Sequence, residues 1–231
     1  MGRELERGPL SGPSLRVLGV TGGIGAGKTT VARILRTHGA RIFDADATVH
    51  ELYSGGDLAR RIAVRFGPQV LAADGSVNRA ALAGVVFADA AARKDLESVV
   101  HPAVRGRAEA WLAALRKGGF AGIAVIDAAL LVEAAPPYPL DALMVVTAPV
   151  DVRVARLESR GVPRDEARRR IAAQVDDEAR TKRADVVVVN DGSLDALERR
   201  VQAALRELGW DEAHRSGYTG EAPGGASGGR E

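Results

Sequence analysis

Apolar residues along this chain gather in five short, nearly continuous runs, and stretches with helical periodicity separate them. Runs that do not alternate with polar residues are typical of strands in a parallel sheet, because helices cover both faces of such a sheet. The pattern therefore predicts an α/β fold with three layers around a five-stranded parallel sheet. The predicted strands are residues 15–20, 40–43, 123–126, 143–147 and 186–189.

A glycine-rich segment follows the first predicted strand and precedes a helical pattern from Thr29 to about His38. Residues 22–29 read GGIGAGKT and fit the pattern G-x-x-x-x-G-K-[ST], in which backbone N–H groups surround phosphate groups. Lys28 would reach the β- and γ-phosphates, and the hydroxyl of Thr29 would bind Mg²⁺. The flanking strand and helix favour a nucleotide site over a glycine-rich turn with a chance lysine.

The segment between the second and third predicted strands is longer than a simple crossover needs. Its apolar side chains, such as Leu58, Ile62 and Phe66, indicate helices. We expect a helical insertion at about residues 46–117 that binds the acceptor over the carboxyl ends of the strands, where ligands bind in open α/β sheets. We expect disordered tails at residues 1–14 and 209–231.

Two carboxylates, Asp44 and Asp46, follow the second predicted strand at the edge of the sheet where the glycine-rich loop lies. Phosphoryl transfer needs a group that accepts the proton of the attacking hydroxyl, and an ionised aspartate can accept it. The alternative is that Asp46 only caps the helix that contains Val49 and Leu52. The two carboxylates alone favour neither interpretation. The presence of the phosphate loop favours catalysis.

Other polar residues follow later strands or begin helices. Asp127 ends the third predicted strand, where a carboxylate near Mg²⁺ is expected beside a phosphate loop. Glu133 is either a second acid of the site or an exposed loop residue. His101-Pro102 fits a helix start with proline at the first helical position, where capping and substrate contact are equally good interpretations.

Arginines are concentrated between Arg153 and Arg170, and Gly161-Val162-Pro163 interrupts this stretch. The pattern predicts a helical hairpin, at about residues 150–180, that closes as a lid over bound nucleotide. A solvated face with local ion pairs is the alternative for any single arginine. We expect that at least one of three residues contacts phosphate: Arg153, Arg156 and Arg160.

Composition narrows the classes of function. The net charge of +2 is small, and the basic residues are scattered among acidic ones, so the charge does not indicate a nucleic-acid or membrane surface. The absence of cysteine excludes disulfides, thiolate metal sites and a cysteine nucleophile. No apolar run approaches the roughly 20 residues that span a bilayer, and the polar N-terminus has no signal-peptide core. We expect a cytoplasmic protein without nucleic-acid or membrane partners, and we favour a monomer.

The order of these motifs resembles the dephospho-CoA kinase family over roughly residues 15–208. The similarity lies in TGGIGAGKTT at 21–30, DAD at 44–46, HP at 101–102, LLVE at 130–133, RIAAQ at 170–174, AD at 184–185 and NDG at 190–192. The resemblance implies a P-loop kinase fold and a transfer of the γ-phosphoryl of ATP, with Mg²⁺, to the ribose 3′-hydroxyl of dephospho-CoA. This reaction is the last step of coenzyme A synthesis.

The resemblance also implies roles for individual residues. It implies catalytic roles for Asp46 as base, for Lys28 and for Arg156, and Mg²⁺ contacts for Thr29 and Asp127. The residues implied to bind ATP are Gly23, Gly25, Ala26, Gly27, Lys28, Thr29, Thr30, Asn190 and Gly192. Those implied to bind the acceptor are Asp44, His101, Leu131 and Glu133.

Two positions depart from the family pattern. Thr29 stands where serine is common, and it keeps the hydroxyl that Mg²⁺ binding needs. Ala129 stands where proline is common, which is expected to loosen the loop after the third strand.

Two alternative functions would also use a phosphate loop. Another P-loop small-molecule kinase, with a nucleoside monophosphate or a sugar acid as acceptor, would share the fold and differ in the acceptor lobe. A GTP-dependent switch is disfavoured, since the chain contains neither an N-K-x-D nor a D-x-x-G motif.

Overall fold

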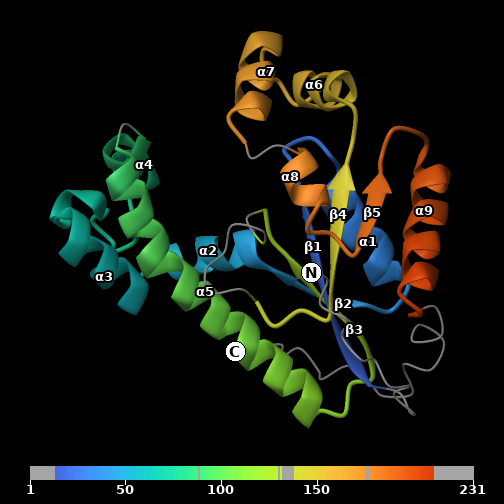
Figure 1. The fold of residues 1–231 in the computed structure, drawn as a ribbon. Helices are drawn as coiled ribbons and strands as arrows, with labels where there is room; N and C mark the ends of the chain where they lie inside the picture. Colours follow the sequence, from blue (N-terminus) through green and yellow to red (C-terminus); the bar gives the residue numbers. More distant parts are fainter. Residues whose placement is uncertain (1–13, 88, 130, 132–137, 175–176, 211–231) are drawn as a thin grey trace, which may run out of the picture.

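A five-stranded parallel sheet forms the centre of the computed structural model (Figure 1), as the apolar runs predict. The structure describes residues 14–87, 89–129, 131, 138–174 and 177–210. The strand order is β2-β3-β1-β4-β5, and the predicted strand bounds are met to within two residues. The strands are β1 (Leu15–Gly22), β2 (Arg41–Asp44), β3 (Gly122–Asp127), β4 (Ala142–Thr147) and β5 (Val186–Val189).

Two helices cover one face of the sheet, α1 (Lys28–Thr37) and α9 (Leu194–Glu207). Apolar residues spaced three or four apart bring Val31 and Leu35 of α1 and Val201 of α9 into one core with β1, β4 and β5. Because α1 begins directly after the glycine-rich loop, this packing fixes the position of the loop at the carboxyl end of β1.

The opposite face is covered by the long helix α5 (Ala90–Lys117). Its buried residues recur every four positions, from Val100 and Val104 to Ala108 and Leu112. Phe43 of β2 belongs to the same core, and the centroid of its ring lies 5.6 Å from that of the Trp111 ring. Helices on both faces complete the predicted three layers.

Shorter helices join β2 to α5. They are α2 (Ala45–Tyr53), α3 (Asp57–Phe66), the 3₁₀ turn η1 (Pro68–Val70) and α4 (Arg79–Phe87). Figure 1 shows α3 and α4 beside the first half of α5, away from the sheet. The segment between β2 and β3 is thus helical, as the periodicity indicates, and its role in binding an acceptor stays a prediction.

The predicted helix start at His101-Pro102 is wrong. Both residues lie inside α5, which begins at Ala90 and is capped by the side chain of Asp89. Proline inside a helix removes one backbone hydrogen bond and usually ends or kinks the helix. Here Val100 and Val104, on either side of Pro102, are both buried, and this tertiary packing outweighs the local preference.

Two helices lie beyond the carboxyl ends of β4 and β1 in Figure 1, α6 (Val150–Glu158) and α7 (Arg164–Ala172). A turn at residues 159–163 separates them, as the arginine-rich stretch predicts, and Val154, Leu157 and Ala167 form a small core between them. The short helix α8 (Asp177–Thr181) follows and leads into β5. Within the described ranges no helix is long and apolar enough to cross a membrane.

Candidate active site

The glycine-rich loop connects β1 to α1 and ends at Gly27, which precedes the helix in the left-handed conformation with φ of 102°. A Cβ atom at this position would lie 2.0 Å from the Nδ2 atom of Asn190. Both observations require glycine here. The first turn of α1 therefore presents its free backbone N–H groups at the loop, where an anion is stabilised.

Two side chains hold the loop from its outer side. Arg156 donates through Nη1 to the carbonyl oxygens of Gly25 and Ala26, at 3.1 and 3.2 Å. Asn190, which is buried, donates through Nδ2 to the Ala26 oxygen at 2.8 Å and accepts from Nη2 of Arg156 at 3.0 Å. Arg156 and Asn190 thus lie at the phosphate loop, and their roles toward the nucleotide stay predictions.

Lys28 brings the acidic residues together. Its Nζ forms an ion pair with Oδ1 of Asp127 and lies 3.7 Å from Oδ2 of Asp46. Asp127 is buried, and burial raises the pKa of its carboxyl group, with Asp44 and Asp46 adding to this rise and Lys28 opposing it. The sheet register explains the cluster, because Asp44 pairs with Asp127 between β2 and β3.

The interpretation of Asp46 as the cap of the following helix is wrong, because Asp44 is the cap. The Oδ1 atom of Asp44 accepts from the N–H of Ala47 at 2.9 Å, and α2 begins at Ala45. Asp46 lies in the first turn with a side chain that is 63% exposed. Its carboxylate therefore remains accessible to a substrate hydroxyl next to Lys28.

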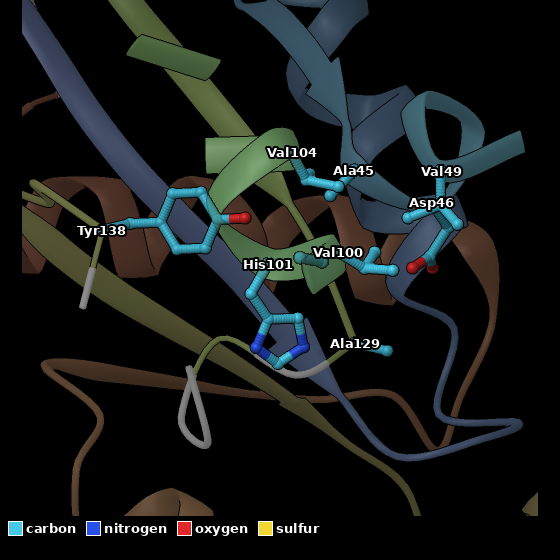
Figure 2. Close-up of a pocket in the computed structure, with 9 residues that line it drawn as sticks. Ala45, Asp46, Val49, Val100, His101, Val104, Ala129 and Tyr138 are labelled. Atoms are coloured by element: carbon cyan, nitrogen blue, oxygen red, sulfur yellow. The ribbon is translucent and has the colours of Figure 1, made fainter. Parts of the chain in front are cut away.

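A cavity of about 180 Å³ lies beside Asp46 (Figure 2). His101 of α5 and Tyr138, which precedes β4, provide its rings, and Figure 2 shows Asp46 on the other side of the cavity from them. Burial raises the pKa of the Tyr138 hydroxyl, with a smaller opposing effect from Arg105. The rest of the lining is apolar: Ala45, Val49, Val100, Val104, Ala128 and Ala129.

The remaining predicted residues are dispersed. Leu131 is buried in the core beneath α5 and does not line the cavity, and Glu133 lies outside the described residues. Thr29 and Arg160 are exposed, at the start of α1 and just beyond α6. Gly23 lies in the glycine-rich loop, and Thr30 lies in the first turn of α1. Gly192 is exposed just before α9.

Arg153 does not lie on the exposed face of α6. It is 2% exposed and donates through Nε to the carbonyl oxygen of Ile24 at 2.8 Å. Burial lowers the pKa of its guanidinium, and the adjacent Asp177 opposes this effect. Arg153 therefore contacts the phosphate loop from outside, in the same way as Arg156.

Comparisons with known proteins agree with this arrangement. A sequence model of the family described as dephospho-CoA kinase matches residues 16–196. The chain belongs to the dephospho-CoA kinase family. It is 43% identical to the dephospho-CoA kinase of Geobacter sulfurreducens over 190 residues, which are 81% of this chain and 96% of that protein. It is 41% identical to that of Moorella thermoacetica over 212 residues, 91% of this chain and 98% of that protein.

Solved structures also match. TT1252 from Thermus thermophilus superposes with a TM-score of 0.67 and 36% identity, over 84% of this chain and 98% of that one. Dephospho-CoA kinase from Campylobacter jejuni superposes with a TM-score of 0.56 over 84% of this chain and 97% of that one. At 23% identity, this second match bears on the fold alone.

Some residues of this dephospho-CoA kinase family member lie at the site although sequence reasoning gave them no role. Gln174 accepts a hydrogen bond from the N–H of Ile24; it belongs to the RIAAQ motif, but no local pattern assigns it a partner. Tyr138 lines the cavity from a segment without a recognisable motif. Thr21 donates to the carbonyl oxygen of Ala129 at 3.1 Å, which anchors this position where the family commonly has proline.

Proposed function

We propose that the protein transfers the γ-phosphoryl group of ATP to the ribose 3′-hydroxyl of dephospho-CoA, giving CoA and ADP. The observation that carries this proposal is that Lys28 at the phosphate loop lies 3.7 Å from Asp46, whose side chain also lines the cavity next to the helical insertion. A phosphate donor and an acceptor hydroxyl would meet at these two residues. Membership of the dephospho-CoA kinase family supports this choice of acceptor.

The loop and Asp46 divide the reaction between them. The backbone N–H groups of the loop and the Lys28 ammonium would hold the phosphates and stabilise the charge that moves toward the leaving oxygen. The carboxylate of Asp46 would accept the proton of the 3′-hydroxyl as its oxygen attacks the γ-phosphorus. The bond between the γ-phosphorus and the bridging oxygen breaks, and ADP leaves.

The residues present fit a Mg²⁺ ion carried with the nucleotide. The hydroxyl of Thr29 and the carboxylate of Asp127 are oxygen donors of the kind that Mg²⁺ takes beside substrate phosphates and water. When bound, the ion would neutralise charge on the β- and γ-phosphates. In this arrangement Lys28, now paired with Asp127, would turn toward the phosphates.

The cavity is smaller than the roughly 300–1,000 Å³ typical of sites that enclose whole ligands of drug size. It would therefore receive only the part of the acceptor that bears the hydroxyl, with His101 and Tyr138 as hydrogen-bonding partners. The rest of dephospho-CoA would extend along the helical insertion. Asp44 would act indirectly, through its cap of the helix that carries Asp46.

Several further aspects of the proposal rest on the sequence. The kinase domain would span residues 15–208, with the acceptor lobe at about 46–117 and the lid at about 150–180. Arg160 would contribute to the lid, and Asn190 and Gly192 would flank the adenine. A cytoplasmic monomer without nucleic-acid partners remains a prediction.

The test measures ADP release from Mg-ATP with and without dephospho-CoA, followed by mass spectrometry of the acceptor. We expect ADP release that depends on the acceptor, and a product with one added phosphate on the 3′ position. ADP release that dephospho-CoA does not stimulate, together with turnover of a nucleoside monophosphate or a sugar acid, would instead assign the chain to another class of small-molecule kinase.

A further inference from the structure

Distant side chains bind both backbone polar groups of one residue in the phosphate loop, Ile24, and so hold the peptide units on either side of it. The N–H of Ile24 donates to Oε1 of Gln174 at 2.7 Å, and its carbonyl oxygen accepts from Nε of Arg153 at 2.8 Å. Gln174 lies just after α7, and Arg153 lies on α6. Ile24 is therefore tied to two separate parts of the predicted lid region.

The two side chains also support each other. Nη2 of Arg153 donates to the same Oε1 of Gln174 at 3.3 Å, and Nη1 donates to Asp177 at 2.7 Å. All three nitrogens of the guanidinium thus have partners, and the group is almost fully buried. A buried charge held by several hydrogen bonds adopts one geometry, since any other leaves polar atoms unpaired.

The sequence of the loop is adapted to this arrangement at Gly23. A Cβ atom at position 23 would lie 2.3 Å from Nη2 and 2.8 Å from Cζ of Arg153. Any residue with a side chain would displace the guanidinium from Ile24. The φ of Gly23 is not in the left-handed region, so the close approach of Arg153, and not the backbone conformation, requires glycine here.

The peptide geometry links these contacts to the anion site. In a planar trans peptide the C=O and N–H point in opposite directions. When Arg153 holds the Ile24 oxygen on the outer side of the loop, the N–H of Gly25 must point to the opposite side. The same argument applies to the Ala26 oxygen, which Asn190 and Arg156 hold, and to the N–H of Gly27.

We propose that Arg153 and Gln174 are positioning residues that fix the two peptide units on either side of Ile24, so that the N–H of Gly25 faces the phosphates of the bound nucleotide. They act from outside the loop and need not touch the nucleotide. This assigns a role to Gln174 and replaces phosphate contact as the role of Arg153. The proposal rests on the nucleotide site of the proposed function, and it does not depend on the acceptor.

The test compares two substitutions of Gln174. Gln174→Leu removes the acceptor of the Ile24 N–H at similar side-chain size, whereas Gln174→Glu keeps an oxygen acceptor for both Ile24 and Arg153. Gln202→Leu, on the partly exposed side of α9, is the matched control. The measurements are ATP affinity by calorimetry, hydrogen exchange of the peptide that contains Ile24, kcat at saturating ATP, and Tm.

For Gln174→Leu we expect about tenfold weaker ATP binding, because the half-buried N–H of Ile24 loses its partner. We also expect faster exchange at Ile24, and kcat at saturating ATP within about threefold of the unsubstituted protein. Gln174→Glu and Gln202→Leu should retain ATP affinity and slow exchange. If the glutamate variant keeps ATP affinity while the leucine variant loses it, the acceptor oxygen is what matters, as positioning requires. A general loss of stability would instead lower the Tm of both variants.

Unchanged ATP affinity and exchange in Gln174→Leu would overturn the proposal. So would equal losses in the leucine and glutamate variants. If the unsubstituted protein binds ATP but does not phosphorylate dephospho-CoA, the proposed function fails while the role of Gln174 is still decided by affinity and exchange. If it does not bind ATP at all, both fail.

Discussion

Two glycines at opposite ends of α1 offer a controlled test of the loop geometry. Gly27 and Gly39 both have positive φ, of 102° and 89°. A Cβ atom at Gly39 would meet nothing within 4 Å, whereas one at Gly27 would lie 2.0 Å from Nδ2 of Asn190. Gly39→Ala therefore measures the backbone penalty alone, and Gly27→Ala measures the same penalty plus the displacement of Asn190.

The magnitudes follow from the contacts. The left-handed conformation costs an alanine roughly 1–2 kcal/mol. Displacing Asn190 removes its hydrogen bond to Ala26, worth about 0.5–1.5 kcal/mol, and the one from Arg156, worth about 1.5–3 kcal/mol because one partner is charged. We expect Gly39→Ala to lose roughly 1–2 kcal/mol of unfolding free energy and Gly27→Ala roughly 3–6.5 kcal/mol.

The assay is thermal unfolding combined with ATP titration. For a chain of this size each kcal/mol lowers Tm by about 2–4 °C. Gly27→Ala should unfold well below Gly39→Ala and should lose ATP binding, while Gly39→Ala should bind ATP normally. Equal Tm values for the two variants, with ATP binding intact in both, would refute the inference that Asn190 and Gly27 are packed together at the phosphate loop.

Three further outcomes follow from the site and the core. Asp46→Asn should lower kcat by about 10²–10⁴ with Tm nearly unchanged, because its side chain is largely exposed; near-normal turnover would exclude it as the base. Burial raises the pKa of the Asp127 carboxyl group above its ordinary value of 3.8. The folded state therefore binds the carboxyl proton more tightly than the unfolded state does. The stability that this proton contributes is lost as the pH rises through the folded-state pKa. In urea titrations, the unfolding free energy of the unsubstituted protein minus that of Asp127→Asn should thus fall as the pH rises above about 4, and a rise would contradict the assignment. Leu112→Ala, at a buried position of α5, should lose about 2–5 kcal/mol, whereas Leu194→Ala at a half-exposed position should change stability by less than about 1 kcal/mol.

The elements that depend on local pattern could be predicted from the amino-acid sequence. The five apolar runs predicted the strands of the sheet to within two residues, because strands of a parallel sheet that helices cover are rich in apolar residues. The phosphate loop was equally clear, since its glycines and Lys28 all lie within one short segment, residues 22–28. The break between α6 and α7 was predicted by Gly161-Val162-Pro163 for the same reason.

Which polar residues contact one another could not be predicted, because it depends on the folded chain. The sequence suggested Asp46 as a possible helix cap, but α2 begins at Ala45, so Asp44 is the cap. Gln174 and Ile24 are far apart in the chain, and they form a hydrogen bond because of how the segment after α7 packs on the loop. Pro102 would end an isolated helix, yet burial of its neighbours on the sheet keeps α5 continuous. Local patterns record backbone preference and average burial, whereas a pair of contacting side chains depends on the folding of the whole chain between them.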